Sequence, residues 1–137
     1  MPTATPLAPL AGAKEVLSSV DRLSTNQLDE LPFGMIQLDP TGRILKFNRT
    51  EGRLARIRPE RQVGLNFFND VAPCTKVKEF HGRFVEGVAR KQLYETFGFT
   101  FKFDHGWRDV AVSLMYSAAT DSVWVLISQQ EPAHSPT

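Results

Sequence analysis

The sequence contains a single cysteine, Cys74, among 137 residues. One thiol excludes an internal disulfide and a metal site built from several thiolates. Such sparing use of cysteine fits a reducing compartment, so we expect a cytoplasmic protein. The lone thiol also raises a question about its own role. It is either a small buried apolar side chain or a point of covalent attachment.

The chain also lacks an excess of charge of either sign. It carries 16 Lys and Arg residues against 15 Asp and Glu residues, for a net charge of +1. This balance provides no strong field to gather nucleic acid or anionic lipid, and no apolar run approaches the roughly 20 residues of a membrane span. The start, MPTATPLAPLAGAKEV, has no basic region, and prolines interrupt its apolar part, unlike a signal peptide.

We expect a monomer or weak dimer without a nucleic-acid or membrane partner.

Familiar enzyme motifs are missing as well. The sequence has no G-x-S-x-G, no G-x-x-x-x-G-K-[ST] and no H-E-x-x-H. Its three histidines, His81, His105 and His134, lie far apart, so nothing local marks a metal site. These absences favour a protein that is not an enzyme and holds no metal.

What is present is a change of hydrophobic period along the chain. Residues 13–24 place their apolar side chains on one helical face, and Ser24 or Thr25 can cap a second short helix. FGMIQLD and RILKFN, joined by PTG, predict a β-hairpin. One longer helix is predicted where Phe80, Phe84, Val85 and Val88 recur at helical spacing.

The C-terminal half predicts three strands in an antiparallel meander. Apolar side chains alternate there, at Phe97, Phe99, Phe101 and Phe103 and then at Val110, Val112 and Leu114. The order of elements predicts an α+β fold, a five-stranded antiparallel sheet with its helices on one side. We expect a flexible N-terminus (1–12), a helical cap (13–30), a core (31–129) and a flexible tail (130–137).

Two side chains suggest chemistry. Cys74 follows Pro73 in NDVAPC, and a thiol near the start of a helix ionises more easily. Glu51 follows the strand ILKFN, either as a solvated carboxylate or as a buried one. Burial would raise the pKa of Glu51 and keep it protonated, able to donate a hydrogen bond to an anion.

Several segments together resemble the photoactive yellow protein family, whose members are PAS-fold blue-light photoreceptors. They are FGMIQLD, GRILKFN, EGR, GLNFFNDVAPCT and EF.GRF.EGVA, within a similarity that runs from Leu28 to Ile127. NFF.DVAPCT is the most specific of them. The resemblance implies a PAS fold with an N-terminal helical cap.

The resemblance also implies a chromophore. Family members carry p-coumaric acid (4-hydroxycinnamic acid) in thioester linkage to the cysteine that matches Cys74, and a glutamate matching Glu51 hydrogen-bonds its phenolate. Other matching pocket positions are Phe67, Val71 and Phe101. The sequence departs from the family pattern at Phe47, Ala55, Ile57, Phe103 and His105, where the family has a tyrosine, a threonine, an arginine, a tyrosine and a methionine.

These departures predict a changed spectrum. Phe47 and Ala55 remove a phenolate donor and the hydroxyl that supports it, at a cost of roughly 1.5–3 kcal/mol for a charge-assisted hydrogen bond. We therefore expect a phenol pKa higher than in relatives with the tyrosine, and absorption shifted toward the ultraviolet at neutral pH.

The resemblance further implies a photocycle. Light isomerises the chromophore, Glu51 protonates the phenolate, and an uncompensated buried carboxylate remains. That charge loosens the cap, residues 13–30, as the signal to an unknown downstream signalling protein, while His105 makes recovery pH-dependent. Coumaroyl-CoA is the expected chromophore donor.

Two alternatives stay open. Phe47, Ala55 and Ile57 are compatible with a PAS domain that binds another ligand or only a partner protein, leaving Cys74 idle. A thiol enzyme or redox sensor using Cys74 requires an exposed thiol of low pKa, which the aromatic surroundings disfavour.

Overall fold

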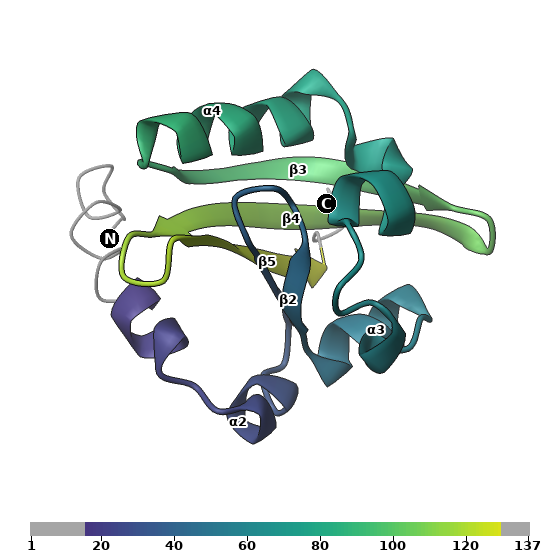
Figure 1. The fold of residues 1–137 in the computed structure, drawn as a ribbon. Helices are drawn as coiled ribbons and strands as arrows, with labels where there is room; N and C mark the ends of the chain where they lie inside the picture. Colours follow the sequence, from purple (N-terminus) through teal and green to yellow (C-terminus); the bar gives the residue numbers. More distant parts are fainter. Residues whose placement is uncertain (1–15, 130–137) are drawn as a thin grey trace, which may run out of the picture.

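The computed structural model describes residues 16–129, built around a five-stranded antiparallel sheet (Figure 1). The strand order is β2-β1-β5-β4-β3. The strands are β1 (Gly34–Leu38), β2 (Ile44–Phe47), β3 (Tyr94–Phe103), β4 (Gly106–Ser117) and β5 (Ser122–Gln129). Consecutive pairing of β3, β4 and β5 confirms the predicted meander, and pairing of β1 with β2 confirms the hairpin.

Short helical segments connect the strands. The α-helices are α2 (Thr25–Asp29), α3 (Arg49–Ala55) and α4 (Arg83–Arg90). Two 3-10 turns (Pro59–Arg61 and Pro73–Thr75) and two π-helical turns (Phe67–Val71 and Lys78–Gly82) complete them. The single longer helix predicted after Cys74 is thus a π-turn that continues into α4. Phe84 is buried, but Val85 lies about 100° further around the helix and faces solvent.

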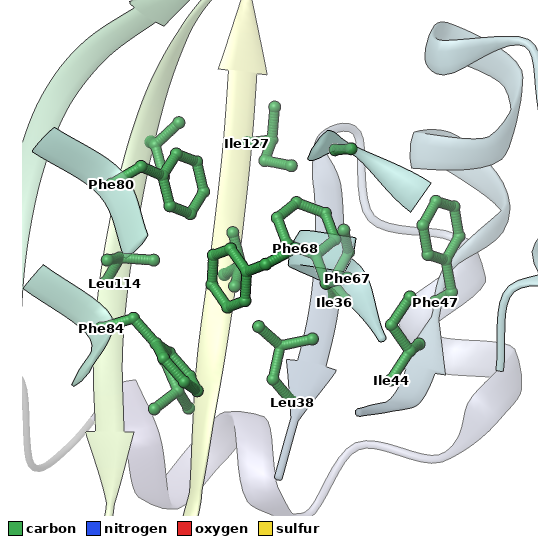
Figure 2. Close-up of a cluster of buried hydrophobic side chains, with 14 of the residues drawn as sticks. Ile36, Leu38, Ile44, Phe47, Phe67, Phe68, Phe80, Phe84, Leu114 and Ile127 are labelled. Carbon is green, nitrogen blue, oxygen red and sulfur yellow. The ribbon is translucent and has the colours of Figure 1, made fainter. Parts of the chain in front are cut away.

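Alternation of side chains gives the sheet two different cores. On one face, residues such as Leu114 and Val125 pack with buried phenylalanines. We call this face the aromatic core, and Figure 2 shows its main members. Its buried phenylalanines are Phe47, Phe67, Phe68, Phe80, Phe84 and Phe101.

The opposite face carries a second cluster, which we call the cap core. It consists of Val20, Leu28, Met35, Met115 and Trp124. The prediction that helices cover only one side of the sheet is therefore wrong. In Figure 1, α4 lies above the sheet and the N-terminal segment with α2 lies below it. β1 is buried on both faces as a result.

Hydrogen bonds fasten the N-terminal segment to the sheet. Residues 16–21 are helical, and Asp21 then accepts hydrogen bonds from Trp124 Nε1 at 2.8 Å and Ser117 Oγ at 2.6 Å. Ser24 caps α2 as predicted, with Gln27 completing a capping box. The segment covers most of the predicted 13–30 cap, and residues 13–15 lie outside the described range.

Within that range, no helix is long and apolar enough to cross a membrane.

Candidate functional site

Cys74 lies at the edge of the aromatic core. Cys74 sits in the 3-10 turn Pro73–Thr75, is free and partly exposed, and packs against the aromatic core. The Lys102 backbone N–H donates to its Sγ at 3.4 Å, which places the thiol against β3. The expectation that Cys74 begins a helix is met only by this three-residue turn. Asn66 caps the neighbouring π-turn instead, through the N–H groups of Phe68 and Asn69.

Aromatic rings continue from the thiol along β3. Phe101 is buried and stacks on Phe103, with ring centroids 5.5 Å apart. His105, in the exposed turn after β3, stacks on Phe103 with centroids 5.4 Å apart. Phe101 and Phe103 flank Lys102 in the sequence, so the strand residue that binds the thiol lies between the two residues whose rings stack.

Glu51 is buried in the first turn of α3, with 3% of its side chain exposed. Asn48 caps this helix and accepts the Glu51 N–H at 3.0 Å. The carboxyl lies against β1 at Gly34, where an added Cβ would collide with Oε1. Of the two readings of Glu51 from sequence, the buried one is confirmed. Gly34, in the FGMIQLD segment, leaves the space that the Glu51 carboxyl occupies.

Arg108 of β4 holds the Glu51 carboxyl. Its Nη1 donates to Oε2 at 2.8 Å and its Nη2 to Oε1 at 3.0 Å, a two-point contact with an arginine that is 11% exposed. The sequence analysis did not identify Arg108. Its position is nevertheless visible in the sequence, because Arg108 continues the inward-facing alternation of Val110 and Val112 by one step.

This contact changes the expected electrostatics. Burial raises the pKa of Glu51 while the hydrogen bonds and charge of Arg108 lower it, and the net direction is upward. The prediction that an ionised Glu51 would be uncompensated is wrong, because a guanidinium faces both of its oxygens. Glu51 can therefore exchange a proton at a pH above that of an exposed glutamate without leaving a bare buried charge.

Two neighbouring residues of β3 connect the thiol with the arginine that pairs with Glu51. Arg108 pairs in register with Phe101, and its Cζ lies 5.9 Å from the Phe101 ring centroid. The thiol of Cys74 contacts β3 one residue further on, at Lys102. The thiol and the arginine that pairs with Glu51 therefore contact neighbouring residues of β3, Lys102 and Phe101.

Comparison with known proteins identifies the family. The PAS fold family model matches residues 25–128. The photoactive yellow protein of Rhodothalassium salexigens is 38% identical over 118 residues, 86% of this chain and 94% of that protein. The one from Halochromatium salexigens is 37% identical with the same coverage. The chain belongs to the photoactive yellow protein family.

A solved structure extends this relationship to three dimensions. The crystal structure of the photoactive yellow protein domain from the sensor histidine kinase Ppr of Rhodospirillum centenum aligns with a TM-score of 0.79 and 38% sequence identity. The alignment covers 82% of this chain and 99% of that one. The PAS fold and the five-stranded antiparallel sheet predicted from the sequence are thereby confirmed.

The structure also places the other predicted site residues of this family member. Phe47, Phe67 and Phe101 are buried in the aromatic core, and Ile57, Val71 and Phe103 are partly buried against it. Ala55 is buried on α3. Apart from Ala55, these positions and Cys74 lie in or against the aromatic core, while His105 lies in the exposed turn after β3. Their roles toward a chromophore stay predictions.

Neither tyrosine replaces the hydroxyl missing at Phe47. Tyr116 donates its hydroxyl to Asp121 Oδ1 at 2.6 Å, and Tyr94 packs against the cap core on the opposite face. Arg108 is the described side chain that donates to Glu51.

Metal ligands do not gather in the described range, where no three His, Cys, Asp or Glu side chains form a group. His81 packs against Phe68, and His134 lies outside the described residues.

Proposed function

We propose that the protein is a photoreceptor that carries a p-coumaroyl group in thioester linkage to Cys74. One observation carries the proposal: the free thiol of Cys74 contacts β3 at Lys102, next to Phe101, and the arginine that pairs with the buried Glu51 lies over the Phe101 ring. Membership in the photoactive yellow protein family supports it. The protein is then a sensor of blue or near-ultraviolet light, and not an enzyme.

The residues present fit such a group. Cys74 Sγ is partly exposed, so it can attack the carbonyl of coumaroyl-CoA, forming its own S–C bond while coenzyme A leaves as the thiol. Phe67, Phe101 and Phe103 belong to or pack against the same apolar cluster as Cys74. When bound, the p-coumaroyl group supplies light absorption and trans-to-cis isomerisation of its vinyl bond.

Glu51 is the proton-exchanging group in this proposal. Its burial raises its pKa, so it can hold a proton on a carboxyl oxygen and release it toward an adjacent anion. Arg108 then receives the resulting carboxylate through two hydrogen bonds. Phe47 and Ala55 add no donor, which supports a raised phenol pKa and absorption nearer the ultraviolet.

The N-terminal cap is the proposed signalling element, and Asn48 links it to Glu51. The buried Asn48 side chain accepts the N–H groups of Glu51 and Met35, and it donates to the carbonyls of Leu28 at 2.8 Å and Phe33 at 3.0 Å. A shift of the first turn of α3 would strain all four bonds together. The cap would then loosen and expose a surface to a downstream signalling protein in the cytoplasm.

The test is acylation of the purified apoprotein with p-coumaric anhydride. We expect a mass increase of one coumaroyl group together with a new absorption band in the visible or near ultraviolet. Cys74→Ser removes the only thiol and should abolish both changes. A wild-type protein that gains no mass, or gains the same mass in Cys74→Ser, would disprove the attachment.

A second candidate is a PAS domain that binds another ligand or a partner without a chromophore. It is favoured by the occupation of both Glu51 oxygens by Arg108 and by the lack of a hydroxyl at Phe47. Under this alternative, acylated protein shows no light-induced change in the infrared carbonyl band of Glu51, whereas the photoreceptor does.

A further inference from the structure

Arg108 is the unexpected component of the site. It lies on β4, two residues before the buried Val110, and crosses the Phe101 side chain to reach Glu51 on α3. The contact joins strand β4 to helix α3, which are 57 residues apart at this point. Arg108 is therefore held by long-range tertiary structure.

The guanidinium has hydrogen-bonding capacity to spare. An arginine offers five N–H donors. In the described structure Nη1 and Nη2 each donate once to Glu51, and Nε donates to Gln129 Oε1 at 3.3 Å. Two N–H groups, one on each terminal nitrogen, are left for another acceptor. The side chain can thus serve Glu51 and a second oxygen at the same time.

Two acids in one buried site compete for the same positive charge when they ionise. A carboxyl and a phenol that lie close together cannot both ionise cheaply, because like charges disfavour each other and burial disfavours both. One adjacent cation offsets one anion. A site that contains two acids and one arginine therefore favours a single shared proton, which titrates as a property of the pair.

We propose that Arg108 is the positioning residue that acts as the common counter-charge of Glu51 and the phenolic oxygen of the bound group. This inference rests on the proposed function. Arg108 offsets part of the loss of the phenolate donor at Phe47. It binds whichever of the two acids is ionised, so that the proton moves between them without leaving a bare charge.

Other charged groups near Glu51 do not compete for this role. On α3 itself, Arg53 is exposed and Arg49 pairs with Asp29 of α2. The 3-10 turn packed against α3 carries Glu60 and Arg61, both exposed. Strand β1 has no charged residue. Asp109, next to Arg108, accepts from Thr100 instead. Among the described residues, Arg108 is the ion-pair partner of Glu51.

The first test uses the apoprotein, without any chromophore. In protein labelled with ¹³C at the glutamate side-chain carboxyl, NMR titration follows Glu51, assigned by its loss in Glu51→Gln. Arg108→Met should raise the pKa of Glu51 by at least about one unit, a tenfold change in its ionisation constant. Arg108→Lys keeps the charge without the two-point contact and should give a smaller shift. It also serves as the test if Arg108→Met does not fold. An unchanged Glu51 titration in both variants overturns the proposal.

The matched control is Arg83→Met. Arg83 also pairs with a glutamate, Glu95, and also lies over a phenylalanine, Phe97, but this pair is far more exposed. The Arg83→Met variant should leave the titration of Glu51 unchanged. A shift of the Glu51 pKa equal to that in Arg108→Met would overturn the specific role of Arg108.

The second test uses acylated protein, after mass spectrometry has verified the attachment. Absorbance titration should show the phenol pKa raised by at least about one unit in Arg108→Met relative to wild type, as expected for loss of a charge-assisted donor. Arg83→Met should match wild type. Acylation followed by an unchanged phenol pKa in Arg108→Met overturns the inference alone. Failure of wild type to acylate overturns the proposed function, and the Glu51 titration still decides whether Arg108 controls that carboxyl.

Discussion

The molecule contains two arginine–glutamate pairs that look alike and differ in what surrounds them. Arg108–Glu51 and Arg83–Glu95 each join a guanidinium to a carboxylate beside a phenylalanine ring. In the first pair the side chains are 11% and 3% exposed, and in the second 36% and 44%. Water compensates the second pair whenever it breaks, but not the first. Burial, more than contact geometry, therefore makes one pair a candidate functional element.

The largest expected difference between the pairs is in stability. Arg108→Met leaves a buried carboxyl without its partner and should lower the free energy of unfolding by about 3–5 kcal/mol. Arg83→Met should lower it by about 1 kcal/mol or less, because exposed pairs contribute little. Urea unfolding of both variants measures this. Arg108→Met with Glu51→Gln should recover much of the loss, and equal losses in the two single variants would contradict the comparison.

The space around Glu51 can be tested without touching either charge. Gly34→Ala places a Cβ against Oε1 of Glu51, so the carboxyl must shift from its present position, and we expect a loss of about 1–3 kcal/mol from overpacking. The control is Gly82→Ala at the start of α4, where an added Cβ would meet its nearest side-chain atom at 3.5 Å. That variant should be neutral or slightly stabilising. Urea unfolding with equal effects at both glycines would show that the Glu51 carboxyl is not tightly confined.

Burial of Glu51 should also produce a characteristic pH dependence. Its pKa is raised in the folded chain, so between about 4.5 and that raised pKa the folded chain binds more protons than the unfolded chain. The contribution of Glu51 to the free energy of unfolding is therefore full at low pH and falls as the pH rises through this window. Urea unfolding at a series of pH values should show this component in wild type and not in Glu51→Gln. An identical pH profile in the two proteins would place the folded pKa of Glu51 at its ordinary value.

The smallest expected effect is the response to salt. A double-mutant cycle on Arg83 and Glu95 should give a coupling of about 0.2–1 kcal/mol that weakens in 1 M NaCl, because salt screens exposed charges. The coupling of Arg108 to Glu51 should be larger and nearly independent of salt. Equal salt sensitivity of both couplings would mean that solvent reaches the buried pair.

Most of the fold could be predicted because its signals are local. The alternation at Val110, Val112 and Leu114 indicated a strand with one face in the core, and the structure buries all three residues completely. The capping of α2 by Ser24 was likewise visible, because a cap depends on neighbours three residues away. The π-helical turns were not predicted, since their period matches neither a helix nor a strand template.

The environment of Glu51 was harder to predict from the sequence, because it depends on residues far away in the chain. The burial of Glu51 depends on Gly34 and Arg108, which lie 17 and 57 residues away in the sequence. Arg108 continues the inward alternation of β4, but a charged side chain is normally assigned to solvent, because burying a charge is costly unless it is paired. Only the fold shows that Arg108 has a buried partner, Glu51. The resemblance to a family indicated Glu51 but not the residue that compensates it.

The two tryptophans make the docking of the cap directly observable. Trp124 is buried beneath the cap, with its indole N–H bonded to Asp21, whereas Trp107 is 72% exposed in β4. Release of the N-terminal segment would expose the first indole to water and shift its fluorescence emission to the red, while the second would report an unchanged environment. With Trp107 replaced by phenylalanine, the chain carries a single built-in optical reporter on the side of the sheet opposite the thiol.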